Sequence, residues 1–67
     1  MENKIKELRK QKGIEQKELA ELAGISHWWM NHVENGTKKP SIRTLIKIAD
    51  ALGVEVEELG VKMKDFF

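Results

Sequence analysis

The segment from Gln16 to Asn35, QKELAELAGISHWWMNHVEN, places the strongest constraint on the fold of this chain. Apolar residues recur at helical spacing on both sides of Gly24, and a glycine can adopt the positive φ that a tight turn requires. Ser26 follows the glycine and has a side chain suited to an N-cap. The segment therefore predicts two short helices, at about 16–22 and 26–34, joined by a tight turn.

The rest of the chain is also predicted to be helical, with glycine and proline marking the ends of the helices. We expect a first helix from Asn3, as its N-cap, to Lys12. A fourth helix from Ile42 to Leu52 would be capped by Ser41, and a short fifth helix would run from Val56 to Gly60. Because no segment has the pattern of a strand, the predicted fold class is all-α, with five short helices.

The predicted core consists of the apolar side chains that share the inner faces of these helices. They are Ile5, Leu8, Leu19, Ala20, Ala23, Ile25, Met30, Val33, Ile42, Leu45, Ile46, Ile48, Ala49, Leu52, Val54, Val56 and Leu59. The tail 61–67, which contains Val61, Met63, Phe66 and Phe67, has no regular period. Its Phe66-Phe67 end either covers the first and fifth helices or forms a dimer contact. With 67 residues and no cysteine, this is one small domain that must be stabilised by packing.

Charged residues occur in blocks of alternating sign, although the net charge of the chain is only +1. Residues 1–13 carry +3 and residues 35–47 carry +4, whereas residues 15–34 and 48–67 carry −3 each. A chain with this pattern can present one basic face to a polyanion, although ordinary solvated helix surfaces would give the same pattern. The sequence has no membrane-spanning run and no signal peptide, so we expect a cytoplasmic protein associated with the nucleoid.

The helix predicted at 26–34 has one apolar side and one side with His27, Trp28, Asn31 and His32. This is the pattern of a helix-turn-helix whose second helix lies in the DNA major groove. Asparagine can make a bidentate contact to adenine, and an exposed indole can contact a thymine methyl group or a base acceptor. Solvated histidines and a tryptophan that contacts another protein are the alternatives.

Four segments, IKELRKQKG, QKELAELAGIS, VENGTKKPS and LIKIADALGV, occur in register along the chain. On these segments the chain resembles the phage-repressor/Cro-like (XRE-type) helix-turn-helix family over residues 4–60. The resemblance implies one lambda-repressor-like DNA-binding domain over residues 1–67, with the helix-turn-helix at the second and third helices. The Trp28-Trp29 pair departs from the family pattern, which suggests either an atypical target site or an engineered sequence.

The resemblance also implies roles for individual residues. The side chains expected to contact bases are Ser26, His27, Trp28, Asn31 and His32. The side chains expected to contact phosphates are Gln16, Trp29, Asn35, Lys38, Lys39 and Arg43. Arg9 and Glu34 match a structural ion pair between the first and third helices. Glu15 is a further departure, since the family usually has Ser or Thr as the cap of the second helix.

These observations predict a sequence-specific double-stranded DNA-binding protein of the transcriptional regulator type. The alternative is a protein-interaction module of the same fold with Trp28 and Trp29 as an apolar anchor. We do not expect the protein to be an enzyme or to bind a cofactor or a small-molecule ligand, because the sequence has no catalytic constellation or phosphate-binding loop. His27 and His32 are five residues apart without a third ligand, so no metal site is expected. Homodimers are common in the family, and the residues leave the oligomeric state open.

Overall fold

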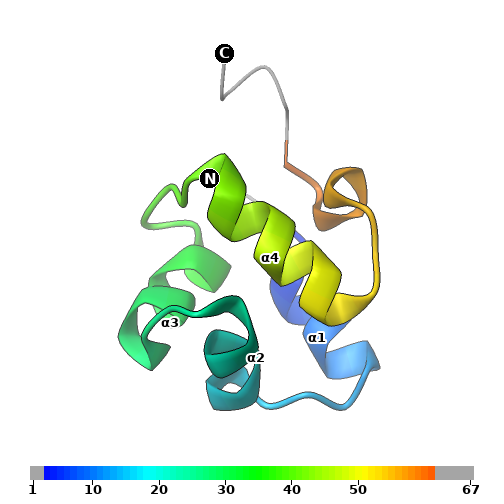
Figure 1. The fold of residues 1–67 in the computed structure, drawn as a ribbon, viewed down its shortest axis with the longest axis horizontal. Coiled ribbons are helices and arrows are strands. Elements are labelled where there is room, and N and C mark those ends of the chain that lie inside the picture. The colour runs from blue at the N-terminus through cyan, green and yellow to red at the C-terminus, as the bar shows by residue number, and fades with distance from the viewer. Residues whose placement is uncertain (1–2, 62–67) are drawn as a thin grey trace.

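The computed structural model describes residues 3–61, and in this part of the chain the regular elements are all helices, with no strand (Figure 1). The α-helices are α1 (Ile5–Gln11), α2 (Gln16–Ala23), α3 (His27–Asn35) and α4 (Ile42–Leu52). A single turn of 3-10 helix, η1 (Val56–Leu59), follows α4. The expected all-α class is confirmed, but the expected fifth α-helix is wrong. The backbone bonds here join residues three apart, from the Glu58 N–H to the Glu55 oxygen and from the Gly60 N–H to the Glu57 oxygen, which is the 3-10 pattern.

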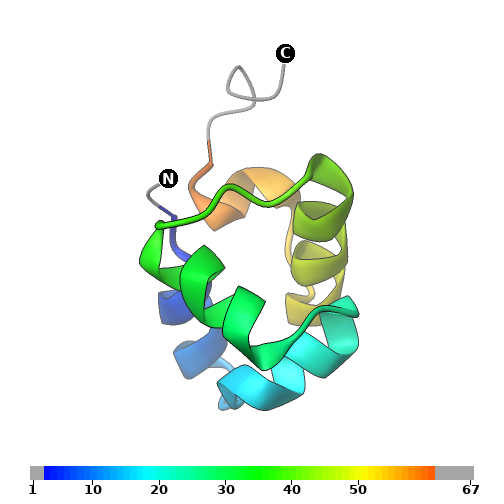
Figure 2. The same cartoon turned by 90° about the vertical axis from the view of Figure 1, so that its left-hand side faces the viewer.

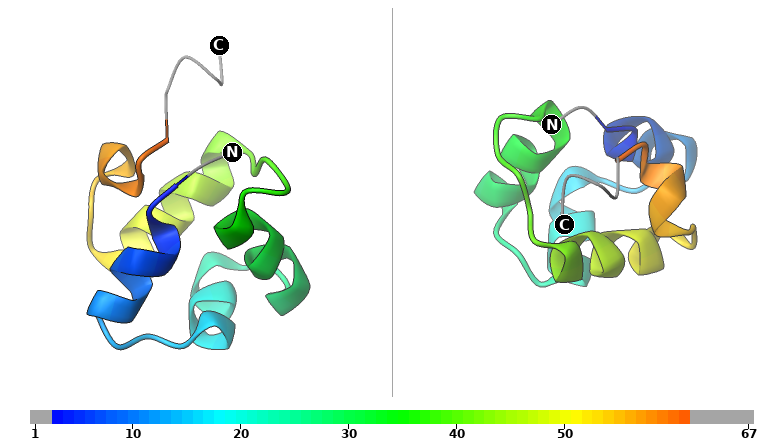
Figure 3. Two further views of the ribbon diagram at one scale, coloured as in Figure 1. Left: turned by 180° about the vertical axis from the view of Figure 1, so that it is seen from behind. Right: turned by 90° about the horizontal axis from the view of Figure 1, so that it is seen from above.

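The α-helices surround one core, and α3 lies at the edge of the molecule. Helix α2 packs against both α3 and α4, and η1 packs against α4. In Figure 2, α3 crosses the front of the molecule and α1 lies behind it. Figure 3 shows α1 and η1 close together near α4. The buried apolar residues are Ile5, Leu19, Ala20, Ala23, Met30, Val33, Leu45, Ile48, Ala49, Leu52, Leu59 and Val61.

The ends of the central helices are set by the local chemistry that the sequence predicts. The Ser26 hydroxyl accepts a hydrogen bond from the Trp29 N–H at 3.0 Å, which caps α3. The Ser41 hydroxyl accepts one from the Thr44 N–H at 3.2 Å, which caps α4. Gly24 ends α2 in the left-handed conformation, with φ 71°, and starts the turn to α3. Any residue other than glycine would have a strained backbone at this positive φ.

The start of α1 differs from the sequence prediction. The helix begins at Ile5 with Lys4 at the N-cap, so Asn3 is not the N-cap residue. Asn3 nevertheless accepts a hydrogen bond from the Ile5 N–H at 3.0 Å through Oδ1. Its Nδ2 donates to the Val33 carbonyl oxygen at 2.8 Å, a contact 30 residues away in the chain. Asn3 therefore connects the start of α1 to the C-terminal part of α3.

Ile46 was expected in the core, but its side chain is 51% exposed. Leu45, Ile48, Ala49 and Leu52 form the buried stripe of α4 at the i, i+3, i+4 and i+7 positions. Ile46 follows Leu45 in the chain, and consecutive helical residues are about 100° apart around the helix axis, so the Ile46 side chain points away from the middle of the stripe. The helical period therefore placed it at the margin of the apolar face, and the packing of α4 leaves it in solvent.

Val61 is buried against the core cluster, whereas Met63, Phe66 and Phe67 lie outside the described residues. The two predictions for the tail, a cover over the helices and a dimer contact, concern mainly that part. No helix within residues 3–61 combines the length and the hydropathy needed to cross a membrane.

Candidate nucleic-acid interface

Helix α3 is divided into a buried side and a solvent-facing side. Met30, Val33 and Glu34 are buried against the rest of the domain. The other side carries four polar or aromatic side chains, which we call the outer face of α3. They are His27, Trp28, Asn31 and His32. His27, Trp28 and Asn31 are exposed and His32 is half-buried, so these side chains are available to a partner.

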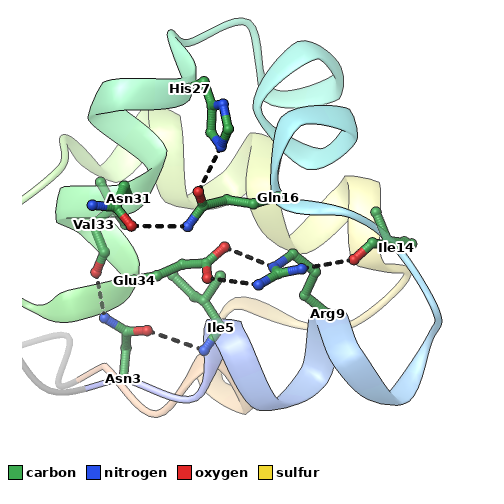
Figure 4. A network of polar contacts seen from close by, with 9 residues as sticks. All are labelled: Asn3, Ile5, Arg9, Ile14, Gln16, His27, Asn31, Val33 and Glu34. Atoms are coloured by element: carbon green, nitrogen blue, oxygen red, sulfur yellow. Dashed lines mark hydrogen bonds and ion pairs between the residues drawn. The ribbon is translucent and has the colours of Figure 1, made fainter.

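A buried ion pair holds α3 against α1 (Figure 4). Arg9 Nε donates to Glu34 Oε2 at 2.9 Å, and Arg9 Nη2 donates to Glu34 Oε1 at 3.1 Å. The third nitrogen, Nη1, donates to the Ile14 carbonyl oxygen at 2.9 Å. The structure thus contains the ion pair that the family resemblance implies. The planar guanidinium of Arg9 thus connects α1 to α3 and to the α1–α2 loop. A lysine ammonium could not make these bonds with the same geometry.

Gln16, the first residue of α2, is hydrogen-bonded to two residues of the outer face of α3 (Figure 4). Its Oε1 lies 2.7 Å from His27 Nε2. Its Nε2 donates to Asn31 Oδ1 at 3.3 Å. An amide oxygen can only accept, so His27 Nε2 carries a proton and donates in this arrangement. We call these three side chains the Gln16 relay. The sequence gives no sign of this arrangement beyond the polarity of its members.

The aromatic residues of α3 form a second cluster. The Trp28 and Trp29 rings stack with their centroids 6.0 Å apart, and the Trp28 and His32 centroids are 4.2 Å apart. Trp28 is 61% exposed, whereas Trp29 is half-buried and packs against the core. The two tryptophans are therefore in different environments, because consecutive residues of a helix point about 100° apart around its axis.

Thr37 was not singled out from the sequence, but it positions His32. Its hydroxyl Oγ1 lies 2.7 Å from His32 Nδ1 and donates to the His32 carbonyl oxygen at 3.2 Å. The one hydroxyl proton serves only one of these two acceptors, and when it goes to the carbonyl oxygen, His32 Nδ1–H donates to Oγ1. The signal that could have identified Thr37 is its place after Asn35-Gly36, where the chain folds back on the last turn of α3.

Basic and polar side chains flank the outer face of α3 on the following loop. Asn35 is the last residue of α3, and Gly36 ends the helix with φ 75°. Lys38 and Lys39 are exposed in the loop, and Arg43 is exposed on the first turn of α4. This segment contains part of the +4 block of the sequence. The loop therefore places cationic groups next in the chain to the outer face.

Another polar residue, Glu15, lies directly before Gln16 at the N-terminus of α2. Glu15 is the N-cap residue, but its side chain makes no capping hydrogen bond. Among residues 3–61, no group of three His, Cys, Asp or Glu side chains has the geometry to hold a metal ion.

Residues 5–59 match a family model described as helix-turn-helix. The chain belongs to this family of transcriptional regulators. The helix-turn-helix regulator YgzD of Bacillus subtilis is 34% identical over 59 residues, which are 88% of this chain and 89% of YgzD. The regulator y4dJ of Sinorhizobium fredii is 38% identical over 52 residues, 78% of this chain and 68% of that protein. The immunity repressor of Bacillus phage phi105 is 36% identical over 56 residues, which are 84% of this chain and 39% of the repressor.

Two solved structures of helix-turn-helix regulators are similar over most of the chain. One is the restriction-modification controller protein C.AhdI from Aeromonas hydrophila, with a TM-score of 0.79 and 38% identity. That match covers 82% of this chain and 83% of C.AhdI. The other is the biofilm regulator SinR of Bacillus subtilis in complex with DNA, with a TM-score of 0.77 and 38% identity. It covers 85% of this chain and 92% of the SinR chain.

Proposed function

We propose that this helix-turn-helix domain binds double-stranded DNA with α3 in the major groove and regulates transcription through this binding. The outer face of α3 is the observation that supports the proposal. It exposes groups that can bond to base edges, while Met30, Val33 and Glu34 hold the opposite side in the domain. The relatives are named as transcriptional regulators, and SinR has been solved with DNA. The alternative of a protein-interaction module gains no support from these matches.

The proposed contacts divide into two groups, those to bases and those to phosphates. The proposed base contacts come from Ser26, His27, Trp28, Asn31 and His32. The proposed phosphate contacts come from Gln16, Trp29, Asn35, Lys38, Lys39 and Arg43. The Ser26 oxygen accepts from the Trp29 N–H, so its hydroxyl proton and one lone pair remain for DNA. Gln16 can still offer its backbone N–H at the positive end of α2, where Glu15 supplies no side-chain cap.

Methylation interference tests the groove assignment. A target site would first be selected from a random duplex library, and guanine N7 in that site would then be methylated. N7 lies in the major groove, so methylation at the centre of the contact should reduce binding. Competition by minor-groove ligands alone would contradict the assignment. A palindromic selected site, together with the stoichiometry of the complex, would show whether two copies bind as a dimer.

The two tryptophans should have different roles, and alanine variants test this. Trp28→Ala removes an exposed ring and should change stability by less than about 0.5 kcal/mol. It should relax base preference at one base pair by about 1–3 kcal/mol. Trp29→Ala removes a half-buried ring that packs on the core, and should cost about 1–3 kcal/mol of stability.

Thermal melting and binding to single-base variants of the selected site would be measured for both alanine variants. Loss of folding in Trp28→Ala, or an equal loss of affinity for all sites, would show that the outer face of α3 is assigned incorrectly.

A further inference from the structure

We propose that Gln16 sets the orientation of the Asn31 amide, so that Asn31 offers only hydrogen-bond donors to DNA and favours guanine over adenine. The inference rests on the proposed function, since it requires α3 to lie in the major groove. It assigns a positioning role to the Gln16 side chain in addition to the proposed phosphate contact. Asn31 of the outer face would then select guanine.

The hydrogen bonds of the Gln16 relay carry this inference. His27 Nε2 and Gln16 Oε1 are 2.7 Å apart, and this short bond directs the Gln16 oxygen to the imidazole. The Gln16 Nε2 group then faces Asn31 and donates to its Oδ1 at 3.3 Å. Figure 4 shows the Asn31 oxygen on the side of Gln16 and its nitrogen on the opposite side. The exposed end of the Asn31 side chain is therefore its NH2 group.

The consequence for base selection follows from the donor and acceptor pattern of the major groove. An unconstrained asparagine contacts adenine with both ends of its amide, since its oxygen accepts from N6 and its nitrogen donates to N7. In this domain the Asn31 oxygen faces Gln16, so the N6 amino group of adenine would lose its partner. Guanine presents two acceptors, O6 and N7, which match the two protons of the NH2 group.

The substitution Gln16→Glu tests whether Gln16 imposes this orientation. A carboxylate is an acceptor at both oxygens, so it can accept from His27 Nε2–H but cannot donate to Asn31 Oδ1. Asn31 would satisfy it by turning its amide over, which directs Oδ1 to the DNA. The turned amide can accept from N6 of adenine and donate its second proton to N7. The single substitution should therefore lower the preference for guanine and shift it toward adenine.

The experiment uses the full chain and the site selected from a random duplex library. The base pair that Asn31 contacts is defined as the one at which Asn31→Ala relaxes discrimination. Wild-type protein should prefer guanine to adenine at this pair by at least about fivefold, the lower range for a specific side-chain contact. Gln16→Glu should lower this ratio by about fivefold or more.

Lys17→Gln is the matched control, because it changes the charge of the same helical turn by the same amount as Gln16→Glu. It should weaken binding to all duplexes and leave the guanine-to-adenine ratio unchanged. Circular dichroism melting would confirm that each variant is folded; Asn31 is exposed and Gln16 half-buried, so we expect all of them to fold.

Three results would overturn the inference while leaving DNA binding intact. They are a wild-type preference for adenine at that pair, an unchanged ratio in Gln16→Glu, and an Asn31→Ala variant that relaxes discrimination at no base pair. If the wild-type protein selects no sequence from the library, the proposed function fails as well. That outcome differs from the other three because in each of them a selected site exists.

Discussion

Replacing Arg9 by methionine should destabilise the domain by about 3–5 kcal/mol. The substitution leaves the Glu34 carboxylate, whose side chain is 0% exposed, without a cation, and it removes the donor to the Ile14 carbonyl oxygen. A domain of 67 residues has a total stability of about 3–10 kcal/mol, so this one change should remove a large share of it. Urea denaturation followed by circular dichroism would measure the loss.

The double substitution Arg9→Met with Glu34→Leu should recover part of this stability. Two apolar side chains can pack in the space of the ion pair without leaving a buried charge unpaired. A double-mutant cycle would give the interaction free energy of the pair. If the effects of the two single substitutions simply add, the pair makes no such contribution, and the position of α3 would depend on apolar packing alone.

Affinity for DNA should fall steeply with salt concentration. Three to five charge-neutralising contacts, mainly from Lys38, Lys39 and Arg43, would give a log–log slope of about −3 to −5 per bound domain. Raising the salt from about 50 to about 200 mM should then weaken binding by about 60- to 1,000-fold. Fluorescence anisotropy with a labelled duplex would measure the slope, and a flat dependence would exclude this set of phosphate contacts.

Single substitutions can identify the cations that contribute to this slope. Lys38→Gln should reduce its magnitude by about one and weaken binding to all sequences equally. Lys6→Gln is the control, because Lys6 is an exposed cation of α1, which lies behind α3 in Figure 2. An equal change of slope in both variants would indicate that the total charge of the protein, and not the loop after α3, determines the salt dependence.

The helix ends near the middle of the chain could be predicted because their determinants are local. Ser26 and Ser41 cap helices through atoms three residues away, and Gly24 needs only its own conformational freedom. The start of α1 was less predictable. Asn3 bonds to both the Ile5 N–H and the distant Val33 carbonyl, and the second contact depends on how the helices pack.

The two sides of α3 could be predicted from the sequence, but the contacts among the side chains of its outer face could not. The helical period of 26–34 separates the outer face from the core, and a buried residue such as Met30 follows from the same period. The Gln16 relay and the Thr37 contact to His32 depend on side-chain rotamers across 15 and 5 residues. Neither periodicity nor residue type contains that information. The exposure of Ile46 was missed because a helical period does not define how wide the buried stripe is.

The division of α3 into two sides has a consequence for how new specificities could be produced. The residues that anchor the helix, Met30, Val33 and Glu34, are not those of its outer face. Random substitution at the exposed positions His27 and Trp28 should therefore leave most members of a library folded. Variation can accumulate on this surface while the supporting domain stays constant, and a single framework can then serve many different target sequences.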